Sequence, residues 1–186
     1  MPIWASFTRT SLAVTVAAAC FAASGCSGAD PSKQARAGTA LSGGNHSAGT
    51  VGYPQASTGE EFWFAMPLPT NMSNRDIKIT NAEVMDAPQG IEVIGYGAYN
   101  LEDTQGLPLI VPEGYPYTPK FREFKDYSED GFTVKSKKVS DIFYVAHLKV
   151  TGKIQKNVSK CRFEYQQGDE VYTQTLRCGL ELRLKK

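Results

Sequence analysis

Few residues in this sequence are of the types that perform nucleophilic, acid–base or redox chemistry. Its cysteines and histidines are Cys20, Cys26, Cys161, Cys178, His46 and His147. A histidine base needs a nucleophile and an orienting acid beside it, and no glycine-framed serine or serine–lysine motif accompanies His147. The cysteines also lack the Cys-x-x-Cys spacing of redox pairs. We therefore predict that the chain is not an enzyme, with a hydrolase that uses His147 as an alternative.

Two groups of residues have metal-ligand types without completing a metal site. Asp126 to Gly131 follows the first half of an EF-hand loop, but the twelfth position is Lys137 where calcium needs a carboxylate. The second group, of types that suit Cu(I), consists of Met66, Met72, Met85 and His147. These methionines are isolated, and Met66 has the inward parity of its segment, so we expect them to pack in the core. We predict no cofactor, with an exported copper or small-ligand carrier as an alternative.

Cys161 and Cys178 lie on two alternating apolar and polar segments that flank Gly168, a pattern typical of a β-hairpin. A four-residue loop from Gly168 to Val171 would place the cysteines directly opposite each other. A two-residue Gly168-Asp169 turn would place them diagonally. In both registers they are close enough for a disulfide. We expect this bond to form, because the N-terminal segment indicates export to an oxidising compartment.

The N-terminal segment has the features of an export signal. Arg9 is the only charged residue before position 30, and an apolar run over residues 12–23 follows it. This run is shorter than the roughly 20 residues of a spanning helix and fits the apolar region of a signal peptide. An ordinary secretory signal, cleaved after a small residue, is one interpretation.

The end of the apolar run supports a more specific interpretation. Ala23-Ser24-Gly25-Cys26 resembles the bacterial lipobox, in which the cysteine receives a diacylglyceryl group and becomes the mature N-terminus. The resemblance implies a lipoprotein signal peptide over residues 1–25 and a lipid on Cys26, with Cys20 as a weaker candidate. Two or three acyl chains anchor a protein stably. We therefore expect the protein on the extracytoplasmic face of the cell membrane.

Composition divides the rest of the chain into two parts. Residues 27–58 are rich in Gly, Ser, Ala and Thr and hold few large apolar residues. Such a segment buries too little surface to offset its ordering entropy, so residues 26–58 are predicted to be the lipidated cysteine and a flexible spacer. From Gly59 onward, short segments alternate with a two-residue period between turn signals. Residues 59–186 are therefore predicted to form an all-β domain, an antiparallel immunoglobulin-like β-sandwich of about seven to eight strands.

The charge balance argues against nucleic acid as a partner. The chain has 20 basic and 19 acidic residues, and removal of the segment with Arg9 leaves the two signs equal. Nucleic-acid binders carry a basic excess that releases counterions from phosphates. We predict no nucleic-acid partner, and the composition does not indicate an oligomeric state.

The segment from Gly95 to Tyr127 is rich in aromatic residues and proline, which disfavours a central strand. One interpretation is a loop surface that binds a protein or glycan. The residues that we assign to this possible binding surface are Tyr96, Tyr99, Tyr115 and Tyr117. The other interpretation, which we favour, is that the aromatic side chains cap one end of the core.

The layout as a whole resembles small lipoproteins of actinobacteria whose role is uncharacterised. The resemblance rests on the lipobox, the Gly/Ser/Ala spacer, an Asn71-containing turn and Pro88-Gln89-Gly90-Ile91 before a strand. It implies an envelope location and an immunoglobulin-like sandwich and attaches no activity to them. We expect a membrane-anchored, non-enzymatic β-sandwich that binds a protein or another component of the cell envelope.

Overall fold

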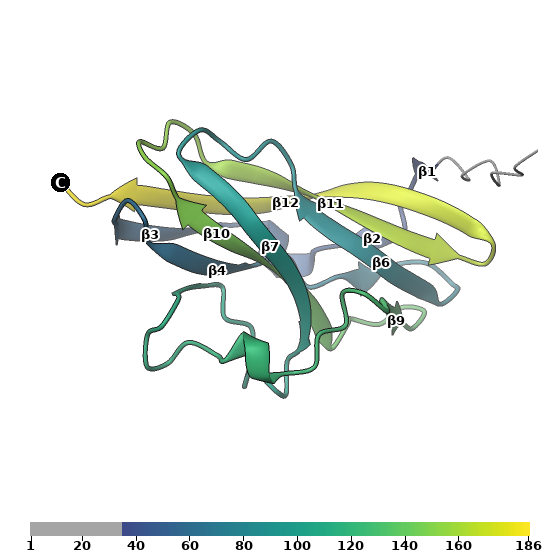
Figure 1. Ribbon diagram of the computed structural model, residues 1–186. Coiled ribbons are helices and arrows are strands. Elements are labelled where there is room, and N and C mark those ends of the chain that lie inside the picture. Colours follow the sequence, from purple (N-terminus) through teal and green to yellow (C-terminus); the bar gives the residue numbers. More distant parts are fainter. Residues whose placement is uncertain (1–34) are drawn as a thin grey trace, which may run out of the picture. The chain divides into compact units, whose positions relative to one another are not determined.

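The computed structural model describes residues 35–186, which form an almost entirely β domain (Figure 1). The predicted signal peptide over residues 1–25, the predicted lipid on Cys26 and the alternative Cys20 lie outside the described residues. In residues 35–186, no helix has the length and apolar character needed to cross a bilayer. The helical segments of this part are η1 (Gly44–Ser47) and η2 (Phe121–Glu123), both single 3-10 turns.

Twelve strands make up the described part of the chain, and seven of them have five or more residues. In chain order they are β1 (Arg36–Ala37), β2 (Leu41–Ser42), β3 (Thr50–Ala56), β4 (Glu61–Ala65), β5 (Thr70–Asn71), β6 (Ile77–Val84), β7 (Ile91–Asn100), β8 (Ile110–Pro112), β9 (Phe132–Val134), β10 (Ile142–Val150), β11 (Val158–Gln167) and β12 (Glu170–Leu184). The number of longer strands agrees with the predicted seven to eight.

These strands form two main sheets. One has the order β1-β12-β11-β6-β9, with β3 also paired to β12, and the other has the order β7-β10-β4-β8. The strands β4, β6, β7, β10, β11 and β12 correspond in chain order to strands B to G of the immunoglobulin fold. That fold places B, E and D in one sheet and C, F and G in the other. The prediction of an all-β, immunoglobulin-like sandwich is therefore confirmed.

Strand alternation decides which side chains fill the space between the sheets. Phe62 and Phe64 on β4 face this main core, as does Tyr144 on β10. Phe163 and Tyr165 on β11 face it from the other sheet. All five side chains are buried. Because the side-chain period of a strand is two, the residues between them on β4 and β10 must point to the outer face of their sheet.

The domain begins earlier than residue 59. β3 pairs in parallel with β12, and β1 pairs in parallel with the start of the same strand. Leu41 and Ala56 are buried. The predicted flexible spacer over residues 27–58 is therefore wrong for the part from Arg36 to Ala56. Main-chain hydrogen bonds to an existing edge strand order this segment, and they do not require the apolar side chains that its composition lacks.

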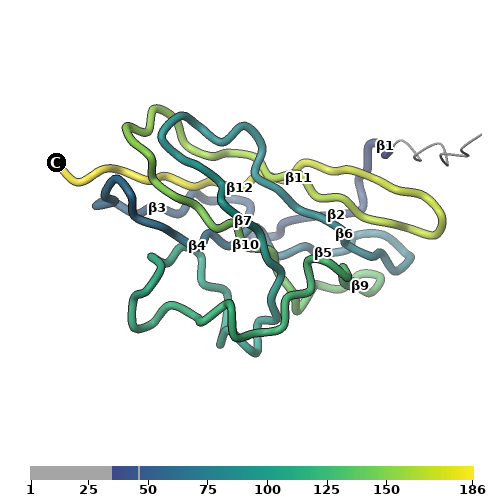
Figure 2. Tube along the Cα trace, in the orientation of Figure 1, coloured from purple at the N-terminus to yellow at the C-terminus, as the bar shows by residue number. Residues whose placement is uncertain are grey.

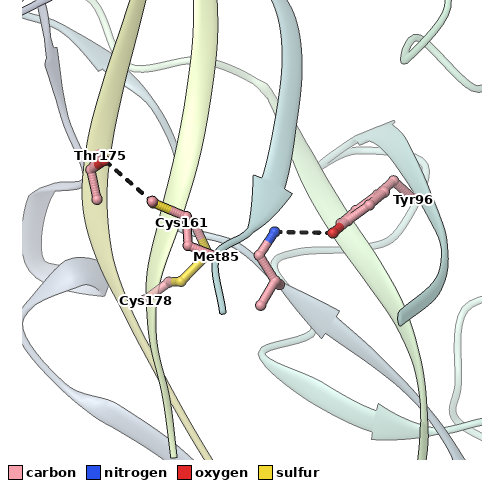
Figure 3. Close-up of a disulfide and its surroundings, with 6 residues drawn as sticks. Met85, Tyr96, Cys161, Thr175 and Cys178 are labelled. Carbon is pink, nitrogen blue, oxygen red and sulfur yellow. Dashed lines mark hydrogen bonds between the residues drawn. A yellow bond between two sulfur atoms is a disulfide. The ribbon is translucent and has the colours of Figure 1, made fainter. Parts of the chain in front are cut away.

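The disulfide between Cys161 and Cys178 is present, as predicted, and joins β11 to β12 with Cα atoms 5.8 Å apart (Figure 3). Gln167 pairs with Glu170, so the hairpin turn has two residues and the cysteines are diagonal to each other. The four-residue loop is therefore wrong. Gly168, with φ of 64°, takes the first turn position, where a II′ turn requires a positive φ.

The connection from β7 to β9 adds β8 to the edge of the β7-β10-β4-β8 sheet, and the rest of it, with η2, covers the outer face of that sheet (Figure 2). It contributes Phe121 to a second, smaller core, with Leu107 and Phe124 packed against it. The sheet contributes Trp63, Ala65, Tyr99, Phe143 and Val145 to this outer core, and the connection after β4 contributes Leu68. The long aromatic connection is thus an ordered layer with its own apolar support.

Candidate functional site

The candidate site lies at the end of the outer core where β4 and β10 pair. Trp63 and His147 are direct cross-strand partners on the outer face. Their rings stack with centroids 4.0 Å apart and planes within 9° of each other. Phe121 packs against the tryptophan ring from the covering connection, with centroids 4.7 Å apart. The indole therefore lies between a histidine of the sheet and an aromatic residue of the loop.

His147 is the predicted alternative for a catalytic base, and its surroundings do not favour that role. Its side chain is nearly buried, and its Nε2 lies 3.1 Å from Glu61 Oε2 without the alignment of a hydrogen bond. Desolvation lowers the pKa of His147, and the carboxylates of Glu113 and Glu61 oppose this shift only in part. Lys149 binds the other oxygen of Glu61 at 3.4 Å. The imidazole is thus a neutral ring whose nearest polar group is an acid.

A second polar pair connects Trp63 to the covering connection. The indole Nε1–H donates a hydrogen bond to Glu113 Oε2, and Arg122 Nη2 lies 3.9 Å from the other oxygen of Glu113. A cavity of about 490 Å³ opens beside this pair. Its lining includes Trp63, Tyr115 and Phe121. Proteins bind small ligands in cavities of this size, where apolar walls give contact area and a few polar groups give orientation.

The four tyrosines predicted as a binding surface separate into three environments. Tyr115 and Tyr117 are 55% and 95% exposed on the covering connection; Tyr115 lines the cavity, and Tyr117 lines a neighbouring pocket. Tyr99 is only 5% exposed and packs on Phe121, so its assignment to an exposed surface is wrong. Burial raises the pKa of Tyr99 to about 12.

Tyr96, the fourth of these tyrosines, forms a hydrogen bond between the two sheets. Its hydroxyl oxygen accepts a hydrogen bond from the main-chain N–H of Val84 on β6, at 3.1 Å (Figure 3). Tyr96 lies on β7, in the other sheet. The side chain therefore links the two sheets. Of the predicted surface, Tyr115 and Tyr117 remain as exposed residues of the covering connection. Tyr99 and Phe121 do not cap one end of the main core, as the favoured interpretation had it, but pack in the outer core on one face of a sheet.

The residues of the copper hypothesis are placed in different surroundings. Met66 is buried in the main core, whereas Met72 is exposed. The sulfur of Met85 accepts a hydrogen bond from the Thr175 hydroxyl at 3.5 Å (Figure 3). His147 lies in the outer face beside Trp63. In residues 35–186, no group of three or more His, Cys, Asp or Glu side chains could hold a metal ion.

The EF-hand-like segment is a turn, as expected. Asp126 Oδ1 accepts hydrogen bonds from the main-chain N–H groups of Ala98 and Ser128. These bonds hold the end of the covering connection against β7. This carboxylate therefore caps main-chain donors of the turn and of β7.

Sequence reasoning missed Trp63, Glu113 and Arg122 as members of one site. The parity of β4 could have placed Trp63 opposite to Phe62 and beside His147. Glu113 gives no comparable signal, because 50 residues separate it from its indole partner and the path of the connection decides their contact.

Comparisons with known proteins return no relative. No protein-family model matches the chain, and neither a curated protein nor a solved structure is significantly similar to it. The site must therefore be interpreted from its own chemistry.

Proposed function

We propose that the protein is a lipid-anchored, extracytoplasmic β-sandwich that binds a protein or glycan of the cell envelope without catalysing a reaction. The surface we assign to the partner is the tyrosine rim, formed by Tyr115, which lines the cavity, and Tyr117, which lines the neighbouring pocket. The observation that carries the proposal is the exposure of these two tyrosines on a connection that Phe121 and Trp63 hold in place. Exposed aromatic residues on a preorganised loop are effective binding anchors, because little entropy is lost on association.

The partner surface is tested by crosslinking on intact cells. We expect the double variant Tyr115→Ala/Tyr117→Ala to lose the neighbour that the native protein captures. Ile94→Ala, which removes an exposed apolar side chain on β7, is the matched control and should keep it. Capture that persists in the double variant would contradict the assignment of this surface.

The anchor is tested separately, through the predicted lipid on Cys26. Without the thiol no diacylglyceryl group can be attached, so we expect Cys26→Ala to release the protein from cells into the medium. Fractionation followed by immunodetection measures this release. Retention of the variant on cells would show that Cys26 does not carry the anchor, whatever the fate of the tyrosine surface.

The cavity beside Trp63 favours a second candidate function, a small-ligand carrier. A bound ligand would contact the only tryptophan after Trp4, so titrations of the purified protein can be followed by its fluorescence. For Cu(I) under reducing conditions we expect no binding tighter than micromolar, because Met66, Met72 and His147 lie in different surroundings. Tight Cu(I) binding would revive the carrier in its copper form.

A further inference from the structure

One end of the sandwich presents basic and apolar side chains together. Two segments, residues 72–76 and residues 135–139, meet there, because Lys137 Nζ donates a hydrogen bond to the main-chain oxygen of Met72 at 2.6 Å. The main-chain oxygen of Lys138 also accepts a hydrogen bond from the main-chain N–H of Asn71, at 2.9 Å. The basic patch, as we define it, consists of Met72, Arg75, Lys137, Lys138 and Val139.

The basic patch differs in composition from the rest of the domain. The two segments carry four basic side chains and one acidic side chain. Residues 35–186 as a whole carry 18 of each sign, once Arg9, Lys33 and Asp30 are subtracted from the full counts. Met72 and Val139 are 53% and 55% exposed in the middle of these charges. The one acid of these two segments, Asp76, pairs with Lys135.

The chain enters the domain at this same end. Arg36 forms an ion pair with Glu170 at 3.2 Å beside the β11–β12 turn. A few residues later, the main-chain oxygen of Ala40 accepts a hydrogen bond from Met72 N–H at 2.7 Å. Only nine residues lie between Cys26 and Arg36, and covalent geometry limits the span of the two to about 35 Å. A lipid on Cys26 would therefore hold the basic patch close to the membrane.

We propose that the basic patch docks on anionic lipid headgroups of the leaflet that holds the lipid of Cys26. This inference rests on the lipid anchor of the proposed function. Each lysine or arginine near an anionic surface strengthens association about fivefold. The short tether makes docking intramolecular and so raises the effective lipid concentration. The exposed side chains of Met72 and Val139 supply apolar contacts at the headgroup boundary.

Docking in this orientation leaves the candidate site free. β12 starts beside Arg36 and ends with Leu184 paired to Ala56, and its 15 residues span roughly 45 Å. Glu113 N–H donates to the main-chain oxygen of Glu61 near that second end. The tyrosine rim is thus displaced along the sandwich from the basic patch and presented away from the lipid.

The test is hydrogen exchange on the full lipidated protein reconstituted in vesicles. Vesicles of phosphatidylcholine with about a third phosphatidylglycerol are compared with vesicles of phosphatidylcholine alone. We expect exchange in residues 72–76 and 135–139 to slow several-fold in the anionic vesicles only. The protection should disappear at about 0.5 M NaCl, where the Debye length falls below the size of a side chain. Residues 113–117 should exchange equally in both vesicles.

Two charge-reversal variants make the test specific. Arg75→Glu/Lys138→Glu should lose the protection, and exchange of β11 reports that the variant is folded. The control variant Lys153→Glu/Lys156→Glu makes the same charge change in the connection before β11. These lysines lie near the start of β11, whereas the basic patch lies near its end, so this variant should keep the protection. If the lipidated protein shows no protection in anionic vesicles, docking is wrong and the anchor stands. The same holds if the protection survives in Arg75→Glu/Lys138→Glu. A measured intact mass without the diacylglyceryl group overturns the anchor and docking together.

Discussion

The residue that best illustrates the site is His147, a buried imidazole next to a carboxylate. Proximity of Glu61 and Glu113 favours the protonated form, whereas desolvation between Trp63 and the sheet disfavours it. Desolvation is the larger effect, so the pKa of His147 lies below its ordinary value and the ring is neutral at pH 7. A neutral ring can stack on the indole without placing an uncompensated charge in the outer core.

The lowered pKa makes stability depend on pH. The unfolded chain binds a proton on His147 more readily than the folded chain, so stability is full above the ordinary pKa of about 6.5 and falls as pH drops below it. We expect urea midpoints to decrease between about pH 7 and pH 5. His147→Phe keeps an aromatic ring against Trp63 and removes the titration, so this part of the decrease should vanish. An unchanged profile in His147→Phe would assign the dependence to other groups.

At the scale of elements, the covering connection is the unusual part of the molecule. Loops on sandwiches usually protrude into solvent, but this one lies on a sheet and closes an apolar layer around Trp63 and Phe121. The prolines, which disfavour a central strand here, also reduce the entropy that the connection loses on ordering. Its stability therefore depends on a few aromatic anchors and is separable from that of the main core.

This separation predicts a local effect of core truncation. Phe121→Ala removes a buried aromatic side chain and should cost about 3–5 kcal/mol, confined mainly to the connection. Hydrogen exchange should accelerate in residues 107–124 and stay unchanged in β6 and β11. Tyr117→Ala removes a 95% exposed ring from the same connection and should leave exchange unchanged both in residues 107–124 and in β6 and β11. Equal acceleration in β11 would show that the two cores unfold as one unit.

The hairpin disulfide gives a second prediction for an element. Cys161 and Cys178 are 17 residues apart, and closing a loop of this length stabilises a protein by about 3 kcal/mol in the chain-entropy model. We expect Cys161→Ala/Cys178→Ala to lower the unfolding free energy by about that amount and to keep the fold, because β11 also pairs with β6. Urea denaturation measures the loss. A variant that does not fold would make the bond a requirement of the topology.

At the scale of the whole molecule, the segment from Arg36 to Ala56 is part of the sandwich. β3 forms main-chain hydrogen bonds with one edge of β12, and its residue Ala56 is buried in the main core. We expect a chain that begins at residue 59 to expose this edge and to aggregate. A chain that begins at residue 35 should remain soluble and keep the melting temperature of the mature protein. Size-exclusion chromatography and thermal melting compare the two, and a cooperative, soluble 59–186 chain would contradict a structural role for β3.

The alternation of apolar residues on β4 and β10 carries enough information to predict a sandwich and the inward position of Met66, and the alternation on β11 and β12 predicts the disulfide between Cys161 and Cys178. These features depend on local periodicity and on residues close in sequence. The ordered segment from Arg36 to Ala56 was not predictable from composition, because its order comes from main-chain hydrogen bonds to β12, more than 100 residues away.

The division between sequence and tertiary structure follows from the range of the interactions. By itself the sequence determined an all-β domain, because side-chain period is a local property of a strand, and it determined which cysteines pair. Only the tertiary structure decided that Tyr99 is buried while Tyr117 is exposed, and that Glu113 meets Trp63. Those outcomes depend on the path of a long connection across a sheet, and no short-range pattern encodes that path.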